Sequence, residues 1–273
     1  MKGISFGQYY PANSVIHKMD PRFKILVAIT FIVATFLCRS AVSFLALLCI
    51  GIALILISRI PLRTIVRSIA PLLFIIGFTV VINIFFGTGE KLLLEVWGIR
   101  IYAEGIWRAL FMFLRIFVLI TSTSVFLTYT TTPMDLTDAL ESLLSPLKVF
   151  HVPVHVFAMM MSITLRFIPT LTEETQKIMN AQKARGADFT NGSLIKRVKA
   201  LIPILIPLFS SAINRATQLA DAMECRCYHG GEGRTRLNVM KWHASDVVYM
   251  LIGIAICVGL VLLNQIQLGY VMN

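Results

Sequence analysis

The chain has 273 residues, of which 57% are hydrophobic and 14% are charged, and its mean hydropathy is +0.78. A soluble domain is nearer half apolar and a quarter charged, so one soluble core cannot bury this much apolar surface. The formal net charge of +11 would suit a nucleic-acid-binding protein, but the cations lie between long uncharged runs, which favours a membrane protein with basic loops and no nucleic-acid partner. The five cysteines form no secreted-type disulfide framework, and residues 1–22 lack the apolar stretch of a secretory signal sequence.

Five uncharged runs predict membrane-spanning helices, at 25–38, 40–58, 68–89, 105–129 and within 247–273. The first run would reach only about 21 Å as a helix, so we expect Lys24 and Arg39 at its ends to extend toward the headgroups. The fourth span carries Arg108 and Arg115, and the deeper Arg115 needs a partner that the sequence does not identify. The predicted fold class is an all-α polytopic membrane protein with about five transmembrane helices and its N-terminus inside.

Two further apolar runs, at 149–165 and 200–214, approach the length of a span. We interpret them instead as the apolar halves of long helices at the cytoplasmic membrane surface, because they contain Pro153, Pro203 and Pro207 and continue into charged segments. If both runs crossed the membrane, the cation-rich segment 170–198 would lie outside, against the positive-inside tendency. The five-span arrangement leaves a short list of cations away from the inner segments: Arg39, Lys91, Arg100, Arg108 and Arg115.

Residues 131–246 are therefore predicted to form a cytoplasmic region of about three helices. It lies between residues 1–130, with the N-terminal segment and four spans, and residues 247–273, with the last span. The three helices are expected from Pro133 to the residue before Pro146, from Pro153 to Ala184 or Arg185, and from Ser193 to about Tyr228. A threonine before Pro133 can cap the first helix, Pro169 is expected to bend the second, and Gly186 is expected to end it.

Each of the two long helices ends in an arginine between small residues, Ala184-Arg185-Gly186 and Cys225-Arg226-Cys227. The ordinary explanation is that a cation is attracted to the negative end of the helix dipole and donates hydrogen bonds to free carbonyl groups. The repetition favours an additional and compatible role, in which two helix ends enter two sockets on a partner. Small neighbours allow close approach, and the guanidinium keeps its charge and its five donors.

The two motifs, with the strings around them, resemble the paired arginine motifs of the transmembrane T component of energy-coupling factor transporters. The strings are Arg166-Phe-Ile-Pro169, Ala181-Gln-Lys-Ala-Arg-Gly-Ala-Asp188, Ala222-Met-Glu-Cys-Arg-Cys-Tyr228 and Gly230-Gly-Glu-Gly233, with Tyr9-Tyr-Pro11, Ser14 and His17-Lys-Met-Asp-Pro-Arg22 near the N-terminus. The likeness covers nearly the whole chain. The departure lies in the second motif, where family members often carry Ala and Gly and this chain carries Cys225 and Cys227.

The resemblance implies a non-catalytic scaffold of the plasma membrane, without a cofactor. It would link two cytoplasmic ATP-binding-cassette ATPases to a membrane-embedded substrate-binding S component, for uptake of vitamins or other micronutrients. Arg185 and Arg226, with their small neighbours, would each dock into one ATPase. An apolar face would meet the S component, and the candidates for it are Met159, Met160, Met161, Leu205 and Leu208. The ordinary alternative is that each of these methionines fills a helix core.

A dedicated nickel or cobalt transporter of the same family is the closest alternative, and the substrate is not identified because its choice belongs to another subunit. Two alternatives come from other classes: a membrane-embedded enzyme lacks convergent catalytic groups, and a permease with its own substrate path lacks inverted repeats. No metal site is expected, because Pro153 separates His151 from His155 and the Cys225–Cys227 pair has no second pair. The chain carries no P-loop, so ATP hydrolysis is expected in its partners.

Overall fold

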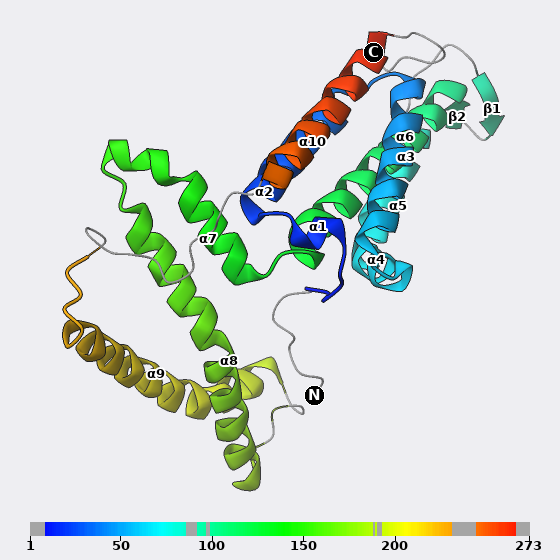
Figure 1. The fold of residues 1–273 in the computed structure, drawn as a ribbon. Helices are drawn as coiled ribbons and strands as arrows, with labels where there is room; N and C mark the ends of the chain where they lie inside the picture. Colours follow the sequence, from blue (N-terminus) through cyan, green and yellow to red (C-terminus); the bar gives the residue numbers. More distant parts are fainter. Residues whose placement is uncertain are drawn as a thin grey trace. The chain divides into compact units, whose positions relative to one another are not determined.

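The computed structural model describes residues 9–85, 92–96, 99–187, 189, 193–230 and 244–265. The chain divides into two compact units (Figure 1), of which unit 1 is Met1–Ala139 with Met240–Asn273 and unit 2 is Leu140–Val239. The tail 268–273 and the glycines at 231–233, which the sequence analysis considered, lie outside the described residues.

Unit 1 is built almost entirely of helices. Its elements are α1 (Val15–Lys18), α2 (Pro21–Leu37), α3 (Ala41–Ser58), α4 (Leu62–Ile69), a 3₁₀ turn (Ala70–Leu72), α5 (Leu73–Phe85), β1 (Leu92–Val96), β2 (Ile99–Tyr102), α6 (Ala103–Thr123), a π-helical turn (Ser124–Tyr129), α10 (Ala244–Leu262) and a 3₁₀ turn (Leu263–Gln265). The boundary between the units falls within α7 (Pro133–Leu143). Unit 2 continues with a 3₁₀ segment (Ser145–Phe150), α8 (Val154–Ala184) and α9 (Leu194–Glu224).

The predicted all-α polytopic class is confirmed. Five stretches are long and apolar enough to cross a membrane by length and composition: Ala41–Ser58, Arg63–Asn83, Ala103–Tyr129, Val154–Ala184 and Val198–Glu224. The first three match the second, third and fourth predicted spans. The first and fifth predicted spans correspond to α2, with 17 residues, and to the shorter apolar helix Asp246–Leu262 within α10. The remaining two are α8 and α9, whose most apolar windows are less apolar than those of the other three.

The short polar stretch expected before the fourth span contains an antiparallel hairpin. β1 pairs with β2 through Glu95 opposite Arg100 and Val96 opposite Ile99. The hairpin is a small addition to a helical fold and leads directly into α6.

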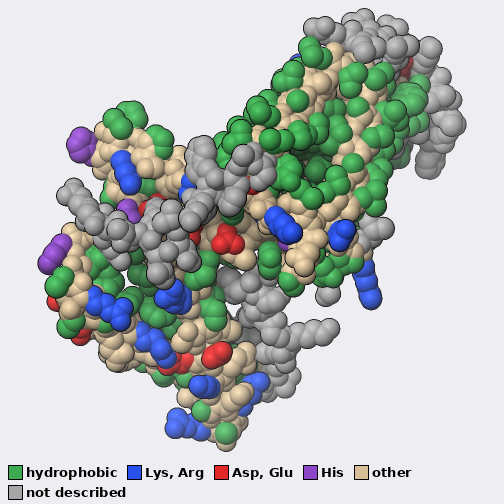
Figure 2. All heavy atoms as spheres, viewed as in Figure 1, with side chains coloured by type: hydrophobic (Ala, Val, Ile, Leu, Met, Phe, Trp, Pro, Cys, Tyr) green, Lys and Arg blue, Asp and Glu red, His purple; other side chains and the backbone are tan. Residues whose placement is uncertain are grey.

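Unit 1 exposes large apolar side chains on its helices. Phe74 of α5 is 82% exposed and Leu56 of α3 is 71% exposed. Figure 2 shows hydrophobic side chains covering much of the visible face of these helices. In water such a surface would drive aggregation, whereas in a bilayer it would face the lipid chains.

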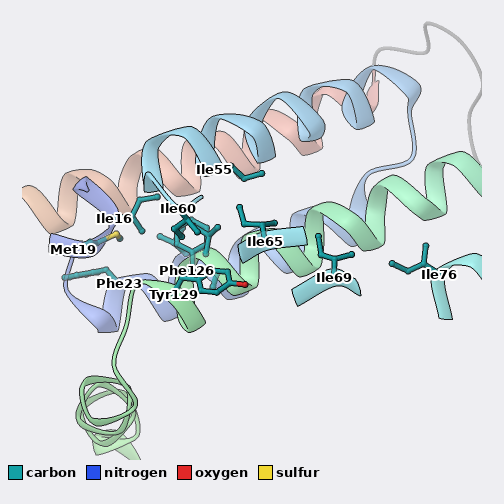
Figure 3. Packing of buried hydrophobic residues seen from close by; sticks show 13 residues of the cluster. Ile16, Met19, Phe23, Ile55, Ile60, Ile65, Ile69, Ile76, Phe126 and Tyr129 are labelled. Atoms are coloured by element: carbon teal, nitrogen blue, oxygen red, sulfur yellow. The ribbon is translucent and has the colours of Figure 1, made fainter. Parts of the chain in front are cut away.

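One of two clusters of buried hydrophobic side chains extends along the helices of unit 1 (Figure 3). It includes Ile16 of α1, Phe23 of α2 and Ile65 of α4, with Phe126 and Tyr129 of the π-helical turn. The Tyr129 hydroxyl donates to the carbonyl oxygen of Thr64 at 3.3 Å, so the polar end of this buried ring is satisfied.

Lys24 lies inside this core, with only 1% of its surface exposed. Its Nζ donates to the carbonyl oxygen of Thr130 at 2.8 Å, to that of His17 at 3.3 Å and to Oγ1 of Thr131 at 3.5 Å. A buried ammonium is tolerated when its three donors are used. Lys24 therefore does not extend toward the headgroups, although its place at the end of an apolar run predicts this: the side chain turns inward because three oxygens replace its water.

Arg115 of α6 finds the partner that the sequence did not identify. Its Nη2 donates to the carbonyl oxygen of Cys38 at 2.7 Å, at the end of α2. The guanidinium also lies over the Phe44 ring, 5.2 Å from its centroid. The partners are therefore a helix-end carbonyl group and an aromatic face, both of which favour a cation.

The turn between α2 and α3 is closed by one distant side chain. Oδ1 of Asn264 accepts from the backbone N–H groups of Arg39 at 2.9 Å and Ser40 at 3.2 Å, while its Nδ2 donates to the carbonyl oxygen of Leu37 at 2.6 Å. These contacts satisfy backbone groups that helix ends leave open. They also join the end of α10 to the turn it covers.

Helix α10 packs directly against α2, and a glycine makes this approach possible. A Cβ at Gly253 would lie 3.0 Å and 3.1 Å from the two γ-carbons of Val27. Gly259 of the same helix has no heavy atom within 4 Å of its Cβ position. Small residues at such contacts let membrane helices approach closely.

We therefore expect Gly253→Val to destabilise the chain by about 1–3 kcal/mol, because the stiff side chain of Val27 cannot yield. The matched variant Gly259→Val should change stability by less than about 0.5 kcal/mol. The midpoint of thermal unfolding of the purified chain in detergent measures both. Equal shifts in the two variants would show that the close approach is not limiting.

Candidate partner-docking site

The two long helices of unit 2 cross at a polar contact. The Glu174 carboxylate of α8 accepts from Oγ of Ser211 at 2.6 Å and from Nη2 of Arg215 at 2.9 Å, both on α9. These two hydrogen bonds lower the pKa of the Glu174 carboxyl below its usual value, and the bond from Ser211 contributes more than the bond from Arg215. Figure 1 shows α8 and α9 crossing, each extending well beyond the contact.

The end of α8 is a Schellman turn. Gly186 has φ +85°, its N–H donates to the carbonyl oxygen of Lys183 at 3.0 Å, and the N–H of Ala187 donates to that of Gln182 at 3.0 Å. Glycine suits this left-handed position because it has no Cβ. Arg185 precedes it with an exposed side chain.

The end of α9 repeats this geometry with a different residue. Cys227 has φ +56°, its N–H donates to the carbonyl oxygen of Glu224 at 2.8 Å, and the N–H of Tyr228 donates to that of Met223 at 3.1 Å. The two turns have hydrogen bonds of the same sequence separation, so Arg226 occupies the position in its turn that Arg185 occupies in the other. A cysteine in the left-handed region is strained, by roughly 1–2 kcal/mol on the scale of left-handed residues.

Both arginines keep their donors unused within the part of the chain that the structure describes. Backbone N–H groups occupy the last carbonyls of each helix, including those of Lys183 and Glu224. Neither guanidinium takes part there in a hydrogen bond or an ion pair, and both side chains are exposed. The helix-dipole explanation remains, but the capping of carbonyls is done by the backbone, which leaves Arg185 and Arg226 available to a partner.

A pocket of about 660 Å³ opens at the second tip. Arg226 and Cys227 line it together with Met159 and Arg166 from the first half of α8. His229 lines it as well. The two cations and the histidine would favour an acidic partner segment. In the sequence Arg166 stands out only as part of a motif, and its approach to Arg226 follows from the helix crossing.

The structure does not bring the two tips together. Because Arg226 shares its pocket with Met159, it lies beside the beginning of α8, whereas Arg185 lies at the end. The stretch of α8 between this pocket, which Met159 and Arg166 line, and Arg185 is roughly 30–40 Å long at 1.5 Å per residue. Two separate partners, or two distant surfaces of one partner, are required to engage both arginines.

The five candidate residues for an apolar docking face differ in exposure. Met160 and Met161 are exposed, and Leu205 is 58% exposed. Met159 and Leu208 are half-buried, and Met159 lines the pocket at the second tip. The exposed apolar surface of α9 extends beyond them, to Ile202, Ile206 and Phe209. Their spacing of three and four residues puts them on one side of the helix and could have identified them in the sequence.

The two histidines considered as metal ligands serve other purposes. Nδ1 of His155 lies 3.0 Å from Oε1 of Glu141, an ion pair or hydrogen bond within unit 2. His151 has φ +58° and ends the 3₁₀ segment. Among the described residues, no group of three His, Cys, Asp or Glu side chains is placed to hold a metal ion.

Comparison with known proteins gives consistent matches over the chain. Residues 12–237 match the family described as cobalt transport protein. The energy-coupling factor transporter transmembrane protein of Lactococcus lactis subsp. cremoris (strain MG1363) is 44% identical over 98% of this chain and 100% of its own length. The protein of the same name from Ruminiclostridium cellulolyticum is 45% identical over 97% and 99%, and that of Brevibacillus brevis is 46% identical over 94% and 97%.

The two helix tips differ in one testable respect. Gly186→Ala places a Cβ in the left-handed region, so we expect backbone amide exchange over residues 183–187 to accelerate about fivefold. Cys227→Gly removes the corresponding strain, so exchange over residues 223–228 should slow by up to about fivefold. Hydrogen–deuterium exchange with mass spectrometry measures both. Faster exchange in Cys227→Gly would contradict the shared geometry.

Proposed function

Because the chain belongs to the family of energy-coupling factor transporter transmembrane proteins, we propose that it couples two cytoplasmic ATP-binding-cassette ATPases to a membrane-embedded substrate-binding subunit. In this role the chain hydrolyses no ATP and binds no cofactor. It passes motion from the ATPases to a subunit that carries vitamins or other micronutrients. The description of the matching family favours cobalt, or the related nickel ion, as the alternative cargo.

The observation that carries the proposal is the pair of equivalent helix ends with unused guanidinium groups. Arg185 and Arg226 occupy the same position in two turns of the same type. Their separation along the helices fits two docking sockets rather than one. The small side chains of Ala184 and Cys225 and the bare backbone of Gly186 let a partner surface reach each guanidinium.

The distribution of charge supports a cytoplasmic position for α8 and α9, although both are long enough to span. The second half of α8 carries Glu173, Lys177 and Lys183, and the crossing contact pairs Glu174 with Arg215. If both helices crossed the bilayer, the cationic segment between them would lie outside. We place them beneath the membrane, in the plasma membrane's inner interface, with their apolar halves facing lipid or a partner.

The apolar face of α9 supports a contact with a second membrane subunit. Leu205, Ile206 and Phe209 are exposed, at 58%, 66% and 69%. Met160 and Met161 on α8 add flexible side chains that can repack against different partners. Such a face suits a scaffold that accepts interchangeable substrate-binding subunits.

We expect the double variant Arg185→Glu/Arg226→Glu to insert normally but to lose at least tenfold of ATP-dependent uptake, because like charges replace the attraction at both sockets. The double variant Lys183→Glu/Lys199→Glu makes the same change of charge at two other exposed cations and should retain most uptake. Co-purification of the ATPases and uptake into proteoliposomes are the measurements. Normal uptake in the arginine double variant would refute the docking role. Arg→Lys at both positions should reduce uptake less, but not leave it unchanged.

The placement of α8 predicts a labelling pattern. In a chain with its five cysteines replaced, Asn180→Cys should react with a membrane-impermeant maleimide only after the cells are permeabilised. Lys91→Cys, in the predicted outer segment, should react in intact cells. Labelling of Asn180→Cys in intact cells would show that the segment 170–198 is external and that α8 crosses the bilayer.

A further inference from the structure

A second pocket, of about 640 Å³, lies within unit 1, whereas both docking tips belong to unit 2. Its wall combines the N-terminal segment, the end of α3 and the beginning of α10. The residues that matter here are Ser14, Lys18, Leu56, Ile57, Arg59 and Tyr249. Neither the coupling role nor the family resemblance assigns it a ligand.

Two cations at this pocket have no counter-charge within the described part of the chain. Lys18 and Arg59 are exposed, and neither side chain makes an ion pair or a hydrogen bond there. The Asp20 carboxylate accepts from the backbone N–H of Arg22 and the Asp246 carboxylate accepts from the backbone N–H of Asp20, and neither pairs with Lys18 or Arg59. The pocket therefore favours an anion.

The other side of the pocket is apolar and faces outward. Leu56 and Ile57 are 71% and 50% exposed, on the last turn of α3. A small inorganic anion would gain nothing from this surface, whereas a molecule with both a charged head and a hydrocarbon chain would use both sides. Figure 2 shows the same division, with Lys and Arg side chains gathered where α1 and α4 lie and hydrophobic side chains along the helices beyond them.

The pocket also lies at the depth of the lipid headgroups. α3 has 18 residues, so its length of about 27 Å is close to that of the hydrocarbon core, and Arg59 follows its last residue directly. Helix α4 comes next and is amphipathic, with Ile65 and Ile69 buried in the core and Arg63 exposed.

We propose that this pocket binds one anionic phospholipid, with its phosphate between Lys18 and Arg59 and an acyl chain along Leu56 and Ile57. The Tyr249 hydroxyl, at the pocket wall, is a further donor for the headgroup. That the lipid belongs to the inner leaflet rests on the proposed function, which puts the N-terminus inside. The site itself requires only that α3 spans the membrane.

The test compares lipid retention by variants of the purified transporter complex. Lys18→Met keeps the aliphatic stem, and Arg59→Asn keeps a residue that tolerates the left-handed backbone of Arg59, at φ +55°. We expect this double variant to bind phosphatidylglycerol about thirtyfold more weakly in native mass spectrometry, from the loss of two cations at the membrane surface. Arg63→Gln, which removes a cation outside the pocket, should reduce binding less than about fivefold. Equal binding by all three proteins would overturn the proposal.

Two further arms identify the source of the phosphate and do not depend on a variant. Inorganic phosphate at millimolar concentration should not displace phosphatidylglycerol, and displacement would show a site for the free ion instead. A phosphatidylglycerol with a photoactivatable acyl chain should label the wild-type chain at residues 56–57, and labelling only elsewhere would overturn the proposal. Neither arm measures uptake, so loss of the docking role at Arg185 and Arg226 would leave these results unaffected.

Discussion

The structure of unit 1 depends on the burial of one ammonium group. Lys24 cannot stay charged in an apolar core unless its donors are used, and the oxygens that use them come from two other segments, one before α2 and one after the π-helical turn. Residues 130–131 lead directly to α7, where Oγ1 of Thr132 accepts from the backbone N–H of Asp135 at 3.2 Å and starts the helix. The same contact therefore fixes the N-terminal segment and the point at which the chain leaves the bundle.

Helix ends account for several of the other polar contacts in unit 1. In a bilayer the groups that helix ends leave open cannot turn to water, so the chain provides its own partners. Asn264 closes the turn between α2 and α3, and Arg115 takes the carbonyl of Cys38. At the tips of α8 and α9, backbone N–H groups donate to the carbonyl groups of the last turn. The two arginine side chains are therefore not needed as capping groups. The need to pair the backbone groups at helix ends thus gives structural roles to polar side chains in unit 1. At the tips of α8 and α9 the backbone meets this need, so Arg185 and Arg226 have no such role.

The sequence predicted the helices better than it predicted their contacts. Long uncharged runs marked α3, α5 and α6, and Gly186 marked the end of α8, because apolar length and left-handed turns have local causes. The partner of Arg115 was not predictable, since a backbone carbonyl group has no sequence pattern. Lys24 was wrongly expected to point outward, because two of its three acceptor oxygens come from residues more than a hundred positions away. The left-handed Cys227 was also missed, since cysteine is not usual there.

The position of the crossing contact determines how motion at the tips would travel, given the proposed coupling role. Glu174 divides α8 into a tip arm to Arg185 of about 16 Å and an opposite arm to Met160 of about 21 Å, so a rotation about the contact moves both ends by similar amounts.

On α9, the arm from Ser211 to Arg226 is about 22 Å, and that to Leu205 only about 9 Å. The same rotation of α9 would therefore move its apolar face less than half as far as its tip. The hydrogen bonds from Ser211 and Arg215 to the Glu174 carboxylate fix the position of such a pivot. Equal motion of the two ATPases would thus tilt the apolar surface rather than shift it evenly, with the α8 side moving further than the α9 side.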